Sequence, residues 1–106
     1  MISNIKSQMR KGILEYCILA IISRNEVYAS DILETLKTAE IVVVEGTVYP
    51  LLTRMKNEGL LSYRWQESTG GPPRKYYSLT DDGRTLLNQL SNEWQSICQA
   101  VNQITQ

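Results

Sequence analysis

The spacing of apolar residues changes in the middle of this chain and then changes back. Leu61, Tyr63 and Trp65 alternate with polar residues, which is typical of a strand with one buried face. The turn-rich segment STGGPP at residues 68–73 separates this strand from a second predicted strand at residues 74–79. The sequence therefore predicts a mainly α protein that contains one small β-hairpin.

Three helical segments precede the hairpin. Residues 7–23 are apolar on nearly all sides, which predicts a central helix that is covered on more than one side. Residues 28–37 predict a second helix, and the β-branched residues 41–44 predict an extended connection. Residues 45–57 predict a third helix, and Gly59 stands where a helix often ends in the left-handed conformation.

Pro50 lies near the start of the third predicted helix. A missing N–H costs little there, because the first N–H groups of a helix have no intrahelical partner. Thr47 and Tyr49 then belong to the N-terminal end of this helix. In a helix-turn-helix protein, that end of the second motif helix reaches base edges in the major groove. The alternative is that Tyr49 only packs on the hairpin and Pro50 only marks the start of the helix.

The last segment predicts one long helix, with Thr80 as its N-cap and an end near residue 104. Its apolar residues follow a heptad spacing over about 36 Å, which is more than a small core can cover. We therefore predict a homodimer in which this helix also packs on the first helix of its partner. The predicted interface consists of Leu87, Leu90, Trp94, Ile97, Val101 and Ile104.

The order of helix, helix, helix, hairpin and long helix is that of a winged helix-turn-helix. We expect residues 1–79 to form a winged helix-turn-helix DNA-binding domain. Residues 80–106 form the C-terminal dimerisation helix in this interpretation, and the two parts make one compact unit.

Positive charge collects on the third predicted helix and the hairpin, although the chain has 11 basic and 11 acidic residues in total. Five basic residues and two acidic ones lie between residues 46 and 75. A charged cluster can be no more than a solvated face, but here it coincides with a DNA-binding topology. Double-stranded DNA is therefore the predicted partner, and its predicted contacts are Thr47, Tyr49, Arg54, Lys56, Arg74, Lys75, Arg10 and Lys11.

Other classes of function lack support in the sequence. The chain has no histidine, and Gly70 and Gly71 precede a strand, so they do not form a phosphate-binding loop. Cys17 and Cys98 are far apart, which argues against a metal site and favours small buried side chains in a reducing compartment. No segment approaches the roughly 20 apolar residues of a membrane span. We expect a cytoplasmic protein that is not an enzyme and needs no cofactor.

Four motifs make the sequence resemble the PadR-like transcriptional regulators, in the short subclass with a single C-terminal helix. They are EGTVYPLL at residues 45–52, EGLL at 58–61, GPPRKYY at 71–77 and LTDDG at 79–83. The chain departs from the family pattern at Val44, where a small or polar residue usually opens the third helix, and at Ala29, where glycine is frequent. The resemblance covers nearly the whole chain and implies a homodimeric winged-helix repressor. Two-fold symmetry would place it on a near-palindromic operator.

The resemblance also implies that a small aromatic ligand relieves repression in some family members. In multidrug-responsive relatives, a tryptophan in this part of the last helix stacks on flat ligands at the dimer interface, which makes Trp94 the candidate ligand residue. Plain interface packing is the alternative role for Trp94. For the whole protein, the alternative function is a winged-helix module that binds only other proteins. Such a module would expose an acidic or apolar third helix, whereas this chain has Arg54 and Lys56 there.

Overall fold

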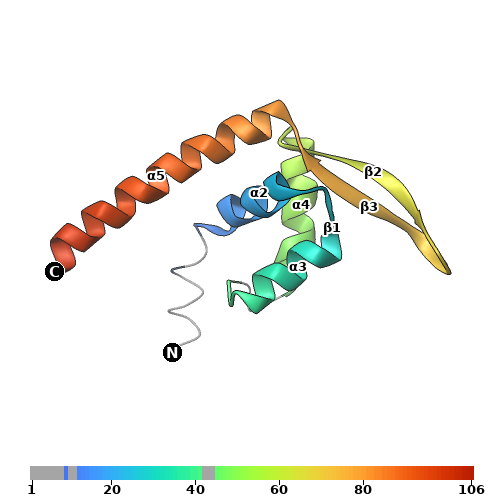
Figure 1. The fold of residues 1–106 in the computed structure, drawn as a ribbon, viewed down its shortest axis with the longest axis horizontal. Helices are drawn as coiled ribbons and strands as arrows, with labels where there is room; N and C mark the ends of the chain where they lie inside the picture. The colour runs from blue at the N-terminus through green and yellow to red at the C-terminus, as the bar shows by residue number, and fades with distance from the viewer. Residues whose placement is uncertain (1–8, 10–11, 42–44) are drawn as a thin grey trace.

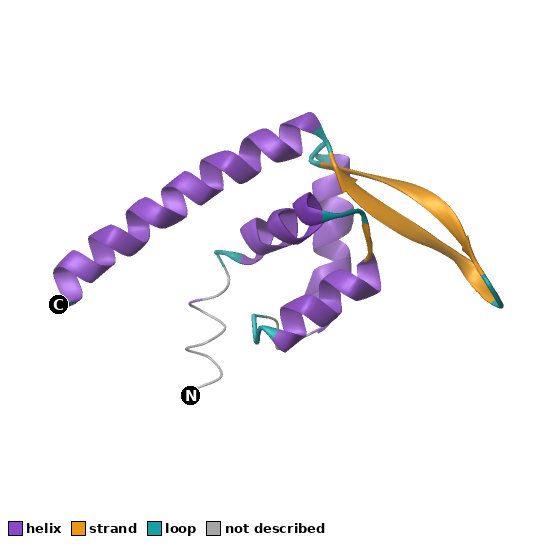
Figure 2. Cartoon of the chain, in the orientation of Figure 1, coloured by secondary structure: helices purple, strands orange, loops and turns teal. Residues whose placement is uncertain are grey.

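The computed structural model describes residues 9, 12–41 and 45–106 of the chain. The three shorter helices form a compact group, from which a β-hairpin and a long last helix extend in opposite directions (Figure 1). Figure 2 shows the same division into helices and strands. The predicted fold, mainly helical with a small sheet and a long last helix, is confirmed. In chain order the elements are α2 (Leu14–Arg24), β1 (Val27–Tyr28), α3 (Ala29–Thr38), the 3-10 turn η1 (Glu45–Thr47), α4 (Val48–Asn57), β2 (Leu61–Ser68), β3 (Gly71–Leu79) and α5 (Asp81–Thr105).

The hydrophobic core lies where α2, α3 and α4 meet the base of the sheet. Burying each such side chain contributes about 1.5–3 kcal/mol, so these residues account for much of the stability of the fold. The central position predicted for the first helix is confirmed, although α2 begins only at Leu14 because Gly12 and Ile13 form a turn. The buried side chains are Ile18, Leu19, Ile22, Ile32, Leu36, Val48, Leu52, Met55, Leu61 and Tyr77.

The hairpin is part of a three-stranded antiparallel sheet with the strand order β1-β3-β2. β1 was not predicted, because two residues are too few to show an alternating pattern. Tyr28 pairs with Tyr76 in this strand and is also the N-cap residue of α3, so α3 starts one residue later than predicted. The Asp31 carboxylate accepts a hydrogen bond from the Tyr28 N–H at 3.1 Å, which fixes the entry into the helix.

Both strands of the hairpin are longer than predicted. The turn consists only of Thr69 and Gly70, whereas residues 71–73, expected in the turn, belong to β3. Pro72 and Pro73 are tolerated because β1 pairs with β3 only at Tyr76 and Tyr77, and because the register shift between Gln66 and Ser68 leaves both prolines without a paired residue in β2. The extra length also carries the hairpin beyond the core. Trp65, predicted on a buried face, is therefore 60% exposed.

The third helix begins with the 3-10 turn η1 and continues as α4, in which Pro50 is the third residue. Pro50 thus lies in the first turn, as predicted. Gly59 follows the C-cap of α4 with a φ of 80°, and the Leu60 N–H donates to the Met55 carbonyl at 3.0 Å. This is the glycine-terminated helix end expected from the sequence. Residues 42–44, predicted as extended, lie outside the described residues.

The start of α5 is anchored to the turn between α4 and β2. The Thr80 hydroxyl accepts a hydrogen bond from the Gly83 N–H at 3.0 Å, which confirms Thr80 as the N-cap. The same hydroxyl donates to the Gly59 carbonyl at 2.6 Å. Gly83 is buried against the backbone of Leu60, where an added Cβ would clash with the carbonyl oxygen. These contacts fix the direction in which α5 leaves the core.

The apolar stripe of α5 divides into two halves. Leu86, Leu87 and Leu90 are partly buried and pack against the chain's own core. Beyond them the helix leaves the core (Figure 1). The remaining apolar residues of the stripe are exposed: Trp94 by 40%, Ile97 by 53%, Val101 by 49% and Ile104 by 82%.

Candidate nucleic-acid interface

One side of α4 is buried in the core and the other faces solvent. Val48, Leu52 and Met55 are buried. Tyr49 is 48% exposed, and Lys56, two turns further along the helix, is exposed on the same side. Thr47 is the N-cap residue of α4 and is also exposed. The structure therefore presents the N-terminal end of α4 to solvent, with a tyrosine and a lysine in one row.

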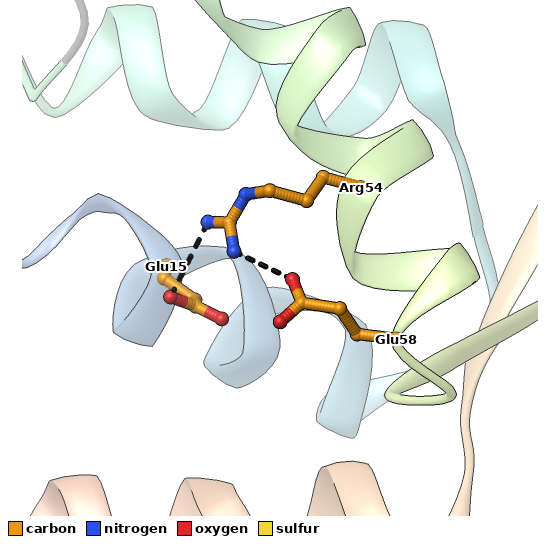
Figure 3. Close-up of polar contacts among 3 residues, drawn as sticks. All are labelled: Glu15, Arg54 and Glu58. Atoms are coloured by element: carbon orange, nitrogen blue, oxygen red, sulfur yellow. Dashed lines mark hydrogen bonds and ion pairs between the residues drawn. The ribbon is translucent and has the colours of Figure 1, made fainter.

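Arg54 lies on a different side of α4 and is engaged in ion pairs within the chain. Figure 3 shows its guanidinium between the carboxylates of Glu15 on α2 and Glu58 at the end of α4. The N–O distances are 3.6 Å to Glu15 and 2.5 Å to Glu58. Ion pairs with this much exposure contribute little to stability, but they orient the side chain toward α2. A phosphate contact by Arg54 would have to compete with two carboxylates.

Arg74 and Lys75 were predicted as a pair, but the structure places them on opposite faces of the hairpin. Successive residues of a strand point to opposite sides, so neighbours in sequence do not share a face. The Lys75 ammonium lies 4.7 Å from the centre of the Tyr63 ring and 5.6 Å from that of Trp65. The Arg74 guanidinium lies 5.0 Å from the Tyr28 ring.

We call the surface of Tyr63, Trp65 and Lys75 the inner wing face. It adjoins α4, because the Lys56 ammonium of that helix lies 5.7 Å from the centre of the Tyr63 ring. Tyr63 and Trp65 meet edge to face at 5.9 Å. The sequence analysis missed Trp65 as a surface residue, because alternation indicates which residues share a face and not how far the core extends beneath it.

We call the opposite surface, formed by Arg64, Arg74 and Tyr76, the outer wing face. The Arg64 Nε is 3.2 Å from a Glu26 carboxylate oxygen, and its guanidinium lies 4.8 Å from the Tyr76 ring. The Tyr76 ring in turn contacts Tyr28, with their centres 4.8 Å apart. Arg64, Tyr76, Tyr28 and Arg74 thus form a continuous row of stacked side chains between the wing and the start of α3.

Burial raises two pKa values in this part of the molecule. The pKa of Tyr77 lies above its ordinary value, first because the phenol is desolvated and then because Tyr63 and Tyr49 are near enough to disfavour its negative form. Desolvation likewise raises the pKa of the Cys17 thiol. Both groups therefore stay neutral at physiological pH.

The remaining predicted features fall in part outside the described residues. Arg10 and Lys11 are not described. Within residues 12–41 and 45–106, no cluster of acidic residues and cysteines has the arrangement of a metal site. In the same part of the chain, no helix combines the length and apolar character that crossing a bilayer requires.

The sequence and the fold both match known transcriptional regulators. The profile of the transcriptional regulator PadR-like family matches residues 18–89. A PadR-like transcription factor from Bacteroides fragilis is 57% identical, with a TM-score of 0.78 over 96% of this chain and 99% of its own. A PadR-like transcriptional regulator from Bacillus cereus is 42% identical, with a TM-score of 0.82 over 94% of this chain and 98% of its own.

A further similar structure contains DNA. It is PadR from Bacillus subtilis in complex with operator DNA. This protein is 26% identical to the chain, with a TM-score of 0.67, and the match covers 74% of the chain and 46% of the larger relative.

Proposed function

The chain belongs to the transcriptional regulator PadR-like family, and from this premise we propose that it binds DNA sequence-specifically as a homodimer and represses transcription. The family consists of regulators and not of enzymes. The observation that carries the proposal is the exposed N-terminal end of α4 beside a wing that bears positive charge. The operator complex of the Bacillus subtilis relative supports it.

In the proposed complex, α4 enters the major groove. Thr47 and Tyr49 contact base edges from its N-terminal end. Lys56, Lys75 and Arg74 contact phosphates, and Arg10 and Lys11 add positive charge near the start of the chain. Arg54 can contribute a phosphate contact only by giving up its ion pairs with Glu15 and Glu58.

The exposed half of α5 supports the proposed dimer. Trp94, Ile97, Val101 and Ile104 leave apolar surface in water, and a second copy of the chain would cover it. The partner's α2 is the further contact that we propose for this helix. Two-fold symmetry then presents two α4 helices to a near-palindromic operator. As a regulator of transcription, the proposed dimer works in the cytoplasm.

A small aromatic effector that relieves repression is also part of the proposal. Trp94 is the residue that would stack on it, since its ring is partly exposed on the proposed dimer surface. The alternative role for Trp94 is packing between the two copies alone. A titration of flat aromatic compounds, followed by tryptophan emission, distinguishes these roles.

Fluorescence anisotropy tests the proposed DNA binding. Labelled DNA from upstream of the protein's own gene is titrated with protein at several salt concentrations, beside a scrambled duplex of equal length. We expect salt-dependent binding with a preference on the order of a thousandfold for the upstream DNA. Absence of binding to either duplex at low salt would reject the proposal and favour a module that binds only proteins.

A further inference from the structure

The two faces of the wing differ in how their positive charges are held. On the outer wing face, Arg64 is paired with Glu26 and stacked on Tyr76, and Arg74 is stacked on Tyr28. On the inner wing face, Lys75 meets only the rings of Tyr63 and Trp65 among the described residues. Glu67, the acidic residue of β2, lies at the register shift near the tip. The charge of Lys75 is therefore free to bind an anion.

The inner wing face continues onto α4. Lys56 reaches the Tyr63 ring from the helix, and Lys75 reaches the same ring from β3. Within residues 12–41 and 45–106, neither lysine forms an ion pair. Two uncompensated ammonium groups from two different elements thus converge on one tyrosine, on the side of α4 that also exposes Tyr49. This arrangement suits a row of negative charges that passes between the helix and the wing.

Trp65 adds a large apolar surface to the same face. Its ring is 60% exposed although it is part of a polar hairpin, and it is oriented by an edge-to-face contact with Tyr63. A tryptophan exposed to this extent beside a lysine suits a ligand that combines apolar and negative groups. The sugar–phosphate strand of a DNA duplex has this alternation, with a deoxyribose between each pair of phosphates.

We propose that the sugar–phosphate strand between the major groove occupied by α4 and the adjacent minor groove lies along the inner wing face. Lys56 and Lys75 bind successive phosphates of this strand on either side of the Tyr63 ring, and the Trp65 ring packs on the deoxyribose beyond the phosphate bound by Lys75. The inference rests on the proposed function, because it specifies how the wing of a DNA-binding protein is oriented. It makes Arg64 and Tyr76 of the outer wing face a structural support that holds the wing against α3, and it makes Arg74 the weakest of the proposed phosphate contacts.

The salt dependence of DNA binding shows which face of the wing contacts the phosphates. The slope of log K against log salt concentration counts the phosphates neutralised by the protein, at about 0.9 per contact. Lys75→Ala is expected to reduce this slope by roughly one unit. The matched control is Arg64→Ala, which removes one positive charge from the outer face of the same hairpin and is expected to leave the slope unchanged. Arg74→Ala, one residue from Lys75 but on the other face, is expected to reduce the slope by less than half as much.

Trp65 is tested by its own fluorescence. The chain has two tryptophans, so a Trp94→Phe background leaves Trp65 as the only one. We expect its emission to change on titration with operator DNA, and Trp65→Ala to weaken binding roughly tenfold without changing the salt slope. Circular dichroism melts of all variants establish that they are folded at the temperature of the binding assay.

The outcomes distinguish the wing orientation from DNA binding itself. If the wild-type protein binds no duplex, the proposed function fails. If the wild type binds but Arg64→Ala reduces the slope as much as Lys75→Ala, the strand runs along the outer wing face and the inference is overturned. It is also overturned if Trp65→Ala leaves DNA binding unchanged and instead shifts the oligomeric state in sedimentation, because the inner wing face would then be a contact between copies.

Discussion

At the residue scale, α3 and α4 end in the same backbone geometry, but a different residue occupies the left-handed position after each helix. In α3 the Ile41 N–H donates to the Leu36 carbonyl at 2.9 Å, as Leu60 does to Met55 after α4. The left-handed position is Gly59 after α4 but Glu40 after α3, with a φ of 59°. The sequence predicted the end of α4 from Gly59. It predicted an end of α3 near residue 37 but not the left-handed Glu40 that follows, because a glutamate gives no signal for a conformation that its Cβ disfavours.

Replacing Glu40 with glycine is expected to stabilise the fold by about 1 kcal/mol, because glycine adopts the left-handed conformation without a steric penalty. Chemical denaturation of the two proteins at equal concentration measures the change. Gly59→Ala is the matched control at the equivalent position of α4, and we expect it to destabilise the fold by about the same amount. A Glu40→Gly variant with a lower free energy of unfolding would contradict this account.

Gly83 is the residue at which close packing, and not a turn, requires glycine. A methyl group there would press on the carbonyl oxygen of Leu60, which belongs to the rigid turn after α4. Gly83→Ala is expected to cost about 2 kcal/mol in the free energy of unfolding, as overpacked sites usually do. Gly12→Ala serves as the control, because no atom lies within contact distance of its added Cβ. Equal stability of the two variants would show that α5 is not fixed at this point.

Tyr77 gives the fold a dependence on alkaline pH. Its folded-state pKa is raised, so its contribution to stability is fully present below the unfolded-state pKa and is lost as pH rises through the folded value. We therefore expect the free energy of unfolding to fall above pH of about 10. Tyr77→Phe should show a smaller fall over the same range, measured by urea denaturation at several pH values. An identical fall in both proteins would assign it to other groups.

Among the elements, α5 and the hairpin show how far periodicity alone can predict a structure. The heptad spacing indicated the right apolar residues of α5 but not which of them its own core would cover, since that depends on where the helix docks. The same reasoning applies to Trp65, whose alternation was predicted while its exposure was not. β1 was not predicted, because two residues are too few to show an alternating pattern. Its Tyr28 nevertheless joins the wing to α3 through the contact with the Tyr76 ring.

The two halves of α5 are expected to respond differently when a large apolar side chain is replaced by alanine. Leu87→Ala removes a side chain that packs on the chain's own core, so the free energy of unfolding should fall by about 2 kcal/mol at every protein concentration. Trp94→Ala removes an exposed ring, so it should instead raise the dimer dissociation constant by tenfold or more, on the order expected for an interface aromatic. Sedimentation over a concentration series measures the second effect. A Trp94→Ala protein that stays dimeric at low micromolar concentration would refute the proposed interface.

At the scale of the whole molecule, the proposed two-fold dimer would fix the separation of its DNA sites. Half-sites read by paired helices lie one helical turn apart, about 34 Å. Inserting five base pairs between the half-sites turns one of them to the opposite side of the duplex, so we expect affinity to fall by at least about a hundredfold toward non-specific binding. The same five base pairs placed outside the half-sites form the control. Unchanged affinity after the internal insertion would indicate a monomeric or flexibly linked reader.

The joint at Thr80 gives this arrangement a mechanical consequence. A single hydroxyl binds the end of α4 through Gly59 and the start of α5 through Gly83. With its 25 residues, α5 is about 37 Å long, and this hydroxyl holds the end of the helix that packs on the core. A tilt of one degree there moves the far end by roughly 0.6 Å. A displacement at Ile104 therefore corresponds to a small rotation at Thr80, next to the end of α4. Thr80 therefore couples the far end of α5 to the end of α4.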